Sequence, residues 1–370
     1  MNSRERILAA FDHKESDRIP VDFNGHRSSG IMVQTYKRLR DALGLPETPC
    51  FVYDFIQQLA YVEPDVLDWV GADVVELGYS SLDKPDFWQS WETPDGTACK
   101  IPAFIDVEKT QEGNVVRGDE GQVICIQKPG HLFFEQTCFP LMDKPVDEFN
   151  RLAYHLDQIM WCRIGIPPAP FGFDEEGMEF LSSWGKELRE REDRAIYGTF
   201  GGNLIEISEF AFRIDNFLCM LAGEPRKVHQ FLDKLTEYHL ANIEKYLAAL
   251  GPNIDIIGFG DDLGMQTGPQ ISPAMYREFF KERHRAIWGK AKEIRPEIKL
   301  SLHCCGDVYT LLPDMIDAGL EAINPVQFVC PGMELTRLKK EFGKDIAFWG
   351  GGCDTQGGLP NGTPPQAKDQ

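Results

Sequence analysis

The stretch Ile298-Lys299-Leu300-Ser301-Leu302-His303-Cys304-Cys305-Gly306-Asp307 joins a strand pattern to a cluster of metal-ligand residue types. Apolar residues alternate along it up to His303, which predicts a β-strand that ends in a glycine turn. Side chains alternate between the two faces of a strand, so we expect His303 and Cys305 to point the same way and Cys304 the opposite way. An imidazole and a thiol at the carboxyl end of a buried strand lie where α/β proteins usually have their functional sites.

The rest of the chain repeats this alternation of strand and helix. Strand patterns, several of them leading directly into polar or glycine-rich loops, cover residues 18–23, 73–77, 194–199, 255–262, 298–303, 321–327 and 345–354. Alternation at this spacing indicates a parallel sheet, and about seven such units predict a (β/α)8 TIM-type barrel. We therefore expect a single α/β domain over residues 1–370.

Residues 85–140 have a different pattern from the rest of the chain. Turn signals at 94–96, 112–114 and 119–121 separate short β-like runs. This pattern predicts a β-rich hairpin insertion, placed after the second strand of the barrel.

Composition and charge limit the classes of partner. The chain has 370 residues, 42% hydrophobic, and a net charge of -20. So acidic a protein is a poor match for nucleic acid or an anionic membrane, and no apolar run approaches transmembrane length. The ten cysteines include no CxxC pair, which favours free thiols in a reducing cytoplasm. We expect a cytoplasmic protein with a small-molecule substrate, and the sequence also allows a homodimer.

His303 and Cys305 are candidate ligands of a metal ion. A catalytic zinc site usually has three protein ligands and one open position, so a third ligand is needed. Cys353 follows the next-but-one strand and could supply it, whereas Cys330 lies in a loop and is a poorer candidate. The residues alone leave another interpretation open, in which a buried histidine is bonded to the backbone beside an inert core thiol.

Other polar residues at expected strand ends are candidates for catalysis or binding. The adjacent carboxylates Asp261 and Asp262 can act as acid and base or bind a cation, or they can simply cap a helix. Arg27, in the loop after the first strand, is the best candidate to bind an anion, although an ordinary surface arginine fits the same pattern. The side chains that could orient a substrate are Asn324, Gln327 and Asp354. No Gly-x-Ser-x-Gly elbow, P-loop or His-Glu-x-x-His motif supports a serine hydrolase, an NTPase or a zincin.

Several segments spread along the chain form a recognisable set. They are Arg18-Ile19-Pro20-Val21, Asp261-Asp262-Leu263-Gly264, Ile271-Ser272-Pro273, His303-Cys304-Cys305-Gly306, Asn324-Pro325-Val326-Gln327, and Trp349-Gly350-Gly351-Gly352 through Asp354 to Gly362-Thr363-Pro364. Together they resemble the uroporphyrinogen decarboxylase superfamily, which also contains zinc-dependent methylcobamide:coenzyme M methyltransferases and related corrinoid-dependent methyltransferases. The superfamily shares a barrel but not a reaction, so the resemblance is specific for the fold and not for the chemistry.

Two departures place the chain closer to the methyltransferase branch. True decarboxylases carry an Arg-Gln-Ala-Gly-Arg-Tyr stretch after the first strand, whose arginines hold porphyrin carboxylates, and an aspartate after the second strand. Here residues 23–30 read Phe-Asn-Gly-His-Arg-Ser-Ser-Gly with one arginine, and the second strand ends Val75-Glu76-Leu77-Gly78. A tetrapyrrole with many carboxylates would therefore be poorly held.

The resemblance also implies a zinc ligand set. The methyltransferase branch uses a His-x-Cys pair, matched by His303 and Cys305, and a later cysteine in the final strand region. After Gly362-Thr363-Pro364 only residues 365–370 follow, so we expect the last βα unit to be missing. The third ligand is then either absent or replaced by Cys353, and the barrel is left with an open edge or is completed by a partner.

Three hypotheses follow. In the first, zinc on His303, Cys305 and Cys353 activates a thiol-type acceptor for methyl exchange with a corrinoid, carried on a corrinoid protein, while Asp261 or Asp262 orients the ligands or manages a proton. In the second, the chain is a metal-free decarboxylase of a porphyrin-like or smaller carboxylated substrate held by Arg27. In the third, it is an inactive homologue that binds a corrinoid or a partner protein.

Overall fold

The computed structural model describes residues 1–78, 84–165 and 173–369. Its centre is a parallel sheet of six strands in the order β16-β15-β14-β11-β10-β3, curled into part of a barrel. The strands are β3 (Val74–Glu76), β10 (Ala195–Gly201), β11 (Ile256–Gly260), β14 (Lys299–His303), β15 (Ala322–Asn324) and β16 (Ala347–Phe348). The expected α/β fold of TIM-barrel type is confirmed, with the difference that no strand ladder joins β3 to β16 among the described residues.

Residues 18–23, expected to be the first strand, do not form one. The Val21 carbonyl accepts a hydrogen bond from the Asp73 N–H (2.8 Å), but the Val21 N–H donates to the Asp73 side chain and not to a backbone carbonyl. Pro20 has no N–H to donate, so a regular ladder cannot form here. The segment nevertheless lies between the two edge strands, because Trp349 Nε1, directly after β16, donates to Asp22 Oδ2 (2.8 Å).

The two faces of the curled sheet bury different sets of residues. Outward-facing side chains such as Ile196, Ile257 and Leu300 belong to the large core shared with the helices. The inward face packs separately with α1 (Ser3–Phe11), in a small cluster made of Ile7, Phe11, Val74, Ala195, Tyr197, Ile256 and Ala322. Helix α1 therefore plugs one end of the curl, and the carboxyl ends of the strands are left for the site.

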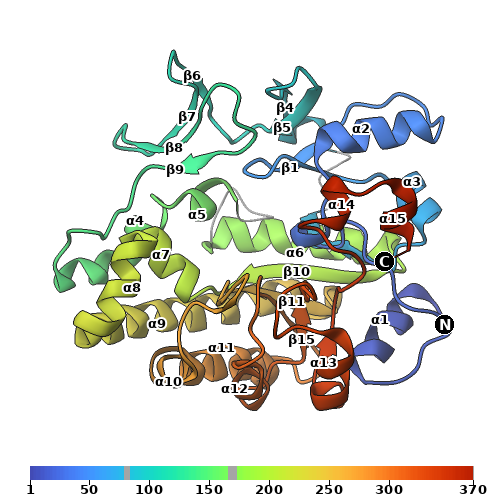
Figure 1. Cartoon of the computed structure of the whole chain (residues 1–370). Coiled ribbons are helices and arrows are strands. Elements are labelled where there is room, and N and C mark those ends of the chain that lie inside the picture. The colour runs from blue at the N-terminus through green and yellow to red at the C-terminus, as the bar shows by residue number, and fades with distance from the viewer. Residues whose placement is uncertain (79–83, 166–172, 370) are drawn as a thin grey trace.

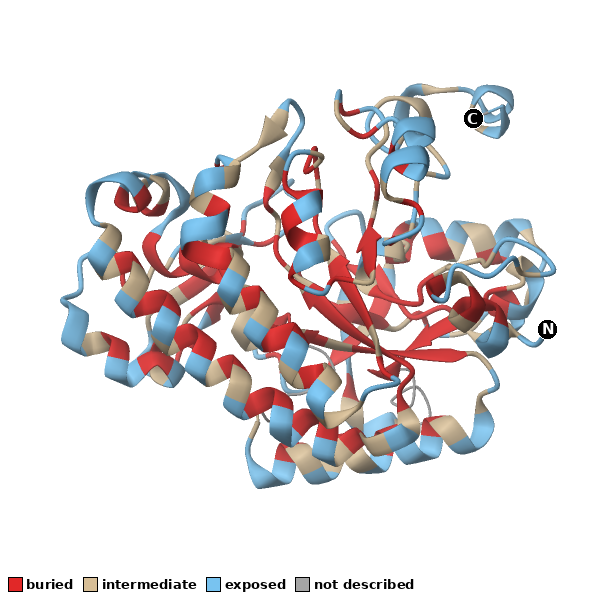
Figure 2. Ribbon diagram, turned by 90° about the horizontal axis from the view of Figure 1, so that it is seen from below, coloured by how far each residue is buried: buried red, intermediate tan, exposed pale blue. Residues whose placement is uncertain are grey.

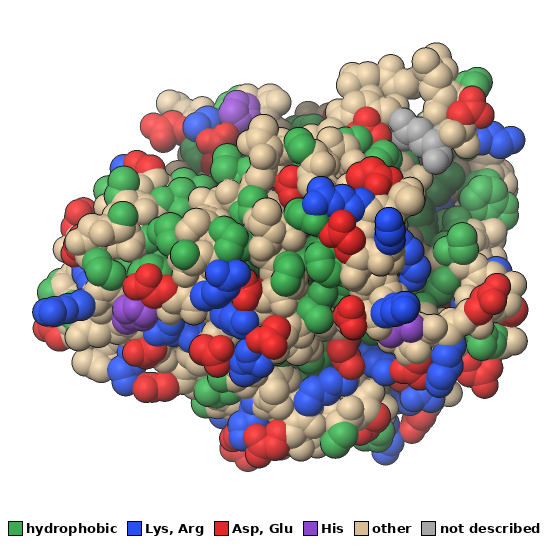
Figure 3. Space-filling model, turned by 60° about the horizontal axis from the view of Figure 1, so that its bottom comes forward, with side chains coloured by type: hydrophobic (Ala, Val, Ile, Leu, Met, Phe, Trp, Pro, Cys, Tyr) green, Lys and Arg blue, Asp and Glu red, His purple; other side chains and the backbone are tan. Residues whose placement is uncertain are grey.

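The described helices include long ones that cover the outer face of the sheet with their buried side turned inward, and three short ones that bury no residue (Figure 2). Besides α1 they are α2 (Val33–Ala42), α3 (Pro64–Val70), α4 (Leu152–Leu156), α5 (Met160–Ile164), α6 (Glu175–Arg191), α7 (Ile205–Phe212), α8 (Ile214–Gly223), α9 (Pro225–Leu250), α10 (Pro273–Met275), α11 (Lys281–Ile294), α12 (Leu312–Asp317), α13 (Leu335–Phe342), α14 (Gly358–Asn361) and α15 (Pro364–Lys368). Within the described ranges, none of them combines the length and the apolarity that crossing a membrane requires. Figure 3 shows basic and acidic side chains interspersed over one face, so the negative charge is not gathered there into one patch.

The expected β-rich insertion after the second barrel strand is confirmed, as two antiparallel pieces. One is the hairpin of β4 (Trp88–Glu92) and β5 (Ala98–Pro102). The other is a four-stranded sheet of β6 (Glu108–Lys109), β7 (Asn114–Arg117), β8 (Val123–Gln127) and β9 (Glu135–Gln136). Two short pairs lie outside the insertion, β1 (Val52–Asp54) with β2 (Leu59–Ala60) and β12 (Gly264–Met265) with β13 (Gly268–Pro269). Figure 1 shows both pieces of the insertion on the side of the sheet opposite α9, α11 and α12.

Candidate functional site

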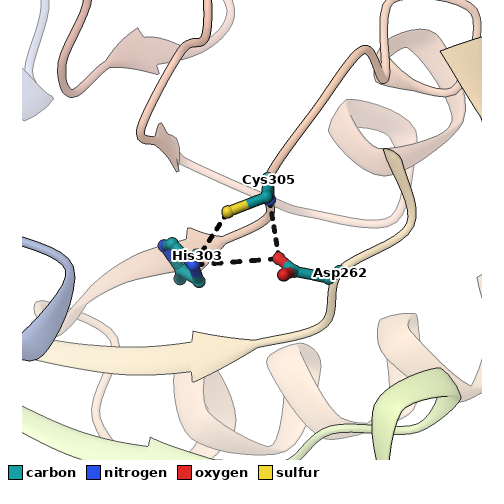
Figure 4. A group of neighbouring side chains, drawn as sticks. All are labelled: Asp262, His303 and Cys305. Atoms are coloured by element: carbon teal, nitrogen blue, oxygen red, sulfur yellow. Dashed lines mark hydrogen bonds and ion pairs between the residues drawn. The ribbon is translucent and has the colours of Figure 1, made fainter. Parts of the chain in front are cut away.

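The carboxyl ends of β11 and β14 bring three potential metal ligands together (Figure 4). Cys305 Sγ lies 3.4 Å from His303 Nε2, and Asp262 Oδ1 lies 3.7 Å from the same nitrogen. One ligand atom from each residue falls within 4.8 Å of the others. The expected orientation is confirmed, because Cys304 points the opposite way and receives the Leu263 N–H at 3.3 Å in the buried helix layer.

Hydrogen bonds on one side of the His303 ring fix its tautomer. Nδ1 lies 2.9 Å from Asn324 Oδ1, and the Asn324 amide is oriented because its Nδ2 donates to the Trp349 carbonyl (3.0 Å). The amide oxygen only accepts, so Nδ1 carries the proton and Nε2 keeps its lone pair. Ser28 Oγ also lies 2.8 Å from Nδ1. Burial lowers the pKa of His303, so a neutral ring presents Nε2 to the other two side chains.

Close packing of two loops holds Asp262 against Cys305. The Cys305 N–H donates to Asp262 Oδ1 (2.6 Å), and the Asp307 N–H donates to the Met265 carbonyl (2.8 Å). A Cβ on Gly264 would lie 2.4 Å from the Cys305 carbonyl oxygen, far inside any real contact. Glycine at this position therefore allows the backbones of the two loops to touch.

The group lies in an acidic environment. Burial raises the pKa of the Cys305 thiol, and the carboxylates of Asp262 and Glu206 raise it further. Burial, Asp262 and Asp261 together raise the pKa of Glu206 well above its ordinary value, and burial with the same two aspartates raises the pKa of Glu209 to about 8. Clustered carboxylates beside a thiol favour protonated forms, and a bound cation would reverse this balance.

Asp261, the neighbour of Asp262 in the sequence, has a different place. Its Oδ1 accepts from the N–H groups of Ile205 (2.8 Å) and Glu206 (3.0 Å) at the start of α7. Its Oδ2 lies 3.1 Å from His284 Nε2, and the side chain is fully buried. Asp261 therefore ties α7 and α11 to the strand end, whereas Asp262 faces the cavity.

A cavity of about 950 Å³ opens beside the group and is lined by Asp262, His303 and Cys305. Its walls come from the strand ends, the loop after residue 24, the insertion and helices α4, α5, α6, α7 and α9. Arg27 and Gln327 also line it, so two of the expected substrate-binding residues reach the same space. The volume suits a substrate of drug-like size.

The structure does not bring the remaining candidates to the group. Cys353 lies in the loop after β16 and is not part of the Asp262, His303 and Cys305 set. The Asp354 carboxylate takes hydrogen bonds from N–H groups of residues 356–358, and Asp354 is not among the residues that line the cavity. Asn324 is buried behind His303, where it orients the ring and does not face a substrate.

Sequence reasoning did not single out Ser28, Asn203 or Glu206. Ser28 stood in the polar loop already noted for Arg27, and Glu206 follows the Gly201-Gly202-Asn203 turn by three residues. Asn203 Nδ2 donates to Glu206 Oε2 at 2.5 Å, which aims the carboxylate along the cavity wall. Glu206 could have been predicted from the sequence, because it is a carboxylate at the start of a helix that follows a glycine turn at a strand end.

Comparison with known proteins gives one family match. The model of the uroporphyrinogen decarboxylase (URO-D) family matches residues 210–350, a stretch that contains Asp262, His303 and Cys305. No curated protein matches the chain. Among solved structures, a methyltransferase from Methanosarcina mazei is similar over 94% of this chain and 82% of its own, with 15% identity and a TM-score of 0.49. The family match over residues 210–350 agrees with the resemblance seen in the sequence.

Proposed function

From the match of residues 210–350 to the URO-D family, we propose that this chain is a zinc-dependent methyltransferase that moves a methyl group between a corrinoid and a thiol-type acceptor. One observation carries the proposal. An imidazole nitrogen with a free lone pair, a thiol and a carboxylate converge at the barrel's carboxyl end, beside a cavity of substrate size.

The donor set fits zinc. One nitrogen, one sulfur and one oxygen ligand are all types that Zn²⁺ accepts, and three protein ligands leave a fourth position for a substrate. The sequence offered Cys353 as the third ligand; we assign that place to Asp262, whose ligand atom lies with those of His303 and Cys305.

Zinc bound here would lower the pKa of an acceptor thiol, so that its thiolate can take a methyl group carried by a corrinoid. The chain's own residues prepare this step. The hydrogen bond from His303 Nδ1 to Asn324 keeps Nε2 available as a ligand. The Asp262 carboxylate accepts the Cys305 N–H and so holds the two loops in register. Glu206, on the cavity wall, is placed to receive a proton released by the acceptor.

Elemental analysis of the purified protein tests the ligand set. We expect about one zinc per chain in the wild type, and a loss of most of it in His303→Ala, Cys305→Ser and Asp262→Asn. Cys353→Ser is the matched control and should keep its zinc. Zinc that is lost in Cys353→Ser but kept in Asp262→Asn would restore the cysteine as third ligand. Zinc absent from all of them would reject the metal-dependent mechanism.

A methyl-transfer assay then tests the reaction itself. Wild-type protein loaded with zinc should demethylate free methylcobalamin in the presence of a thiol, and Cys305→Ser should not. Turnover that is unchanged in the zinc-free protein would contradict the proposed role of the three ligands.

The surroundings of Arg27 bear on the decarboxylase alternative. That reaction would need Arg27 to hold a substrate carboxylate. Arg27 Nη1 instead lies 3.6 Å from Asp54 Oδ2, a carboxylate 1% exposed, and its guanidinium packs 5.5 Å from the centre of the Trp161 ring. Asp54 therefore faces only Nη1, whereas the buried Arg27 Nε and Nη2 have no hydrogen-bond partner among the described residues and are left for an anion.

A further inference from the structure

A chain of hydrogen bonds leads from the site into the helix layer. Asp261 Oδ2 lies 3.1 Å from His284 Nε2, and His284 Nδ1 lies 3.0 Å from the Tyr276 hydroxyl. All three side chains are buried. A carboxylate only accepts, so Nε2 carries the proton of the ring. Burial raises the pKa of Tyr276 well above its ordinary value, so its hydroxyl keeps its proton and donates to Nδ1.

The helix that carries Tyr276 and His284 is shaped to align them. A π-helical turn over Tyr276–Phe280 lies between α10 and α11. In an unbroken α-helix, which turns about 100° per residue, positions 276 and 284 would lie about 80° apart. A π turn takes up one extra residue, so the two positions are spaced like residues seven apart and come within about 20° of each other. The His284 ring also stacks on Trp288, with ring centres 4.7 Å apart and an angle of 6°.

The same helical unit holds the backbone of Asp262. The side chain of Gln270, shortly before α10, donates to the Asp262 carbonyl (2.7 Å), and the Gln270 N–H donates to the Leu263 carbonyl (2.8 Å). His284 holds the side chain of Asp261, the residue before Asp262. The unit of α10, the π turn and α11 therefore anchors both aspartates at the end of β11.

At its other end the chain of hydrogen bonds reaches the cavity wall. Asp261 Oδ1 accepts from the Ile205 and Glu206 N–H groups, which as first donors of α7 have no carbonyl partner within their own helix. Glu206 lines the cavity from there, as Asp262 does from the strand end. The buried Asp261 carboxylate is thus tied to the backbone of both cavity carboxylates, and His284 fixes it in place.

We propose that Tyr276 and His284 are positioning residues of the site, which act through Asp261 to set the places of Asp262 and Glu206 relative to each other. Neither positioning residue is among those that line the cavity, so both act from behind the site. Their importance for metal binding rests on the proposed function, whereas their hold on the start of α7 does not.

Hydrogen exchange in the chelator-treated protein tests the hold on α7. His284→Phe keeps an aromatic ring against Trp288 but removes both hydrogen bonds of the imidazole. The first two amides of α7 should then exchange about tenfold faster, as measured by mass spectrometry on a peptide that covers residues 203–209. His284→Gln returns an N–H donor to Asp261 and should restore most of the protection.

Two further variants complete the exchange test. Tyr276→Phe removes a single oxygen atom and should speed the same amides severalfold. His229→Phe is the matched control, because the His229 ring also stacks on an aromatic ring, that of Phe279, and contacts Arg283; it should leave the amides unchanged. Unchanged exchange in His284→Phe, or in Tyr276→Phe where the first variant does not fold, would overturn the proposal.

Cobalt(II) then tests the hold on Asp262. The visible absorption of bound Co²⁺ depends on the geometry of its ligands, and a purely structural role of His284 would lower stability without changing that absorption. We expect the Kd for Co²⁺ to rise about tenfold in His284→Phe, with altered absorption bands, and to return to within about threefold of the wild type in His284→Gln. Faster exchange with unchanged Co²⁺ binding and absorption would overturn the role toward Asp262. A wild type that binds no Co²⁺ would reject the proposed function, and the exchange measurements would still decide the inference.

Discussion

At the scale of single residues, the Asn324 amide controls what His303 can do. Replacing it by leucine in Asn324→Leu removes the acceptor of the Nδ1 proton, so the ring loses the bond that fixes its tautomer and orientation. Losing such a partner typically weakens metal binding by about 10- to 100-fold. We therefore expect the Kd for Zn²⁺ to rise by this factor, as measured by competition with a chromophoric chelator.

Asn324→Asp separates this effect from a general loss of packing. The aspartate can still accept from Nδ1 but cannot donate to the Trp349 carbonyl, so zinc affinity should fall less than in the leucine variant. Asn150→Leu, at an exposed asparagine in the short helix before α4, is the remote control. Equal zinc affinity in Asn324→Leu and the wild type would contradict the orienting role.

The same scale shows what the sequence could and could not predict about the site. Strand alternation was enough to turn His303 and Cys305 the same way, because that geometry is local. The choice between Asp262 and Cys353 as a neighbour depends on how separate loops pack, which no spacing encodes. Asn324 was correctly placed at a strand end but assigned to a substrate, since periodicity cannot say whether a polar group faces a ligand or another side chain.

At the scale of elements, contact between the β11 and β14 exit loops assembles the site. Gly264→Ala would push a methyl group into the Cys305 carbonyl and the Asp307 N–H, so the loops must separate. Overpacking of this kind typically costs about 1–3 kcal/mol. We expect the free energy of unfolding, measured with urea, to fall by this amount. Zinc binding should also weaken, because Asp262 moves away from Cys305.

Gly289→Ala provides the matched control in the same half of the chain. Gly289 lies within α11, and a methyl group added there would meet no atom of another element within 4 Å, so alanine faces open space. Alanine in a helix interior is favoured over glycine by about 0.5–1 kcal/mol, so this variant should be more stable than the wild type with unchanged zinc binding. A Gly264→Ala protein that gains stability in the same way would refute the loop contact.

At the scale of the whole molecule, the curled sheet is held by charges that lie far apart in the sequence. Asp73, directly before β3, is fully buried and accepts from Arg6 Nη1 (2.6 Å) and Arg18 Nη1 (2.7 Å) as well as from the Val21 N–H. These bonds tie α1 and the 18–23 segment to the edge of the sheet. Periodicity predicted the alternating elements, because each is a local pattern. It misassigned 18–23 as a strand because the Asp73 side chain takes the hydrogen bond that a ladder would have used.

Asp73→Ala should therefore lower the free energy of unfolding of the whole molecule. It leaves the nearly buried Arg6 guanidinium with Asp17 as its remaining carboxylate, and breaking a buried pair in this way typically costs about 3–5 kcal/mol. We expect a loss toward the lower end of that range in the unfolding free energy, measured with urea. Asp215→Ala, which breaks the exposed pair with Arg213, should cost about 0–1 kcal/mol. Because α1 plugs the sheet at the end away from the site, a destabilised Asp73→Ala protein that remains folded should still bind zinc. Equal stability of the two variants would mean that the curl is held by apolar packing against α1 and not by these charges.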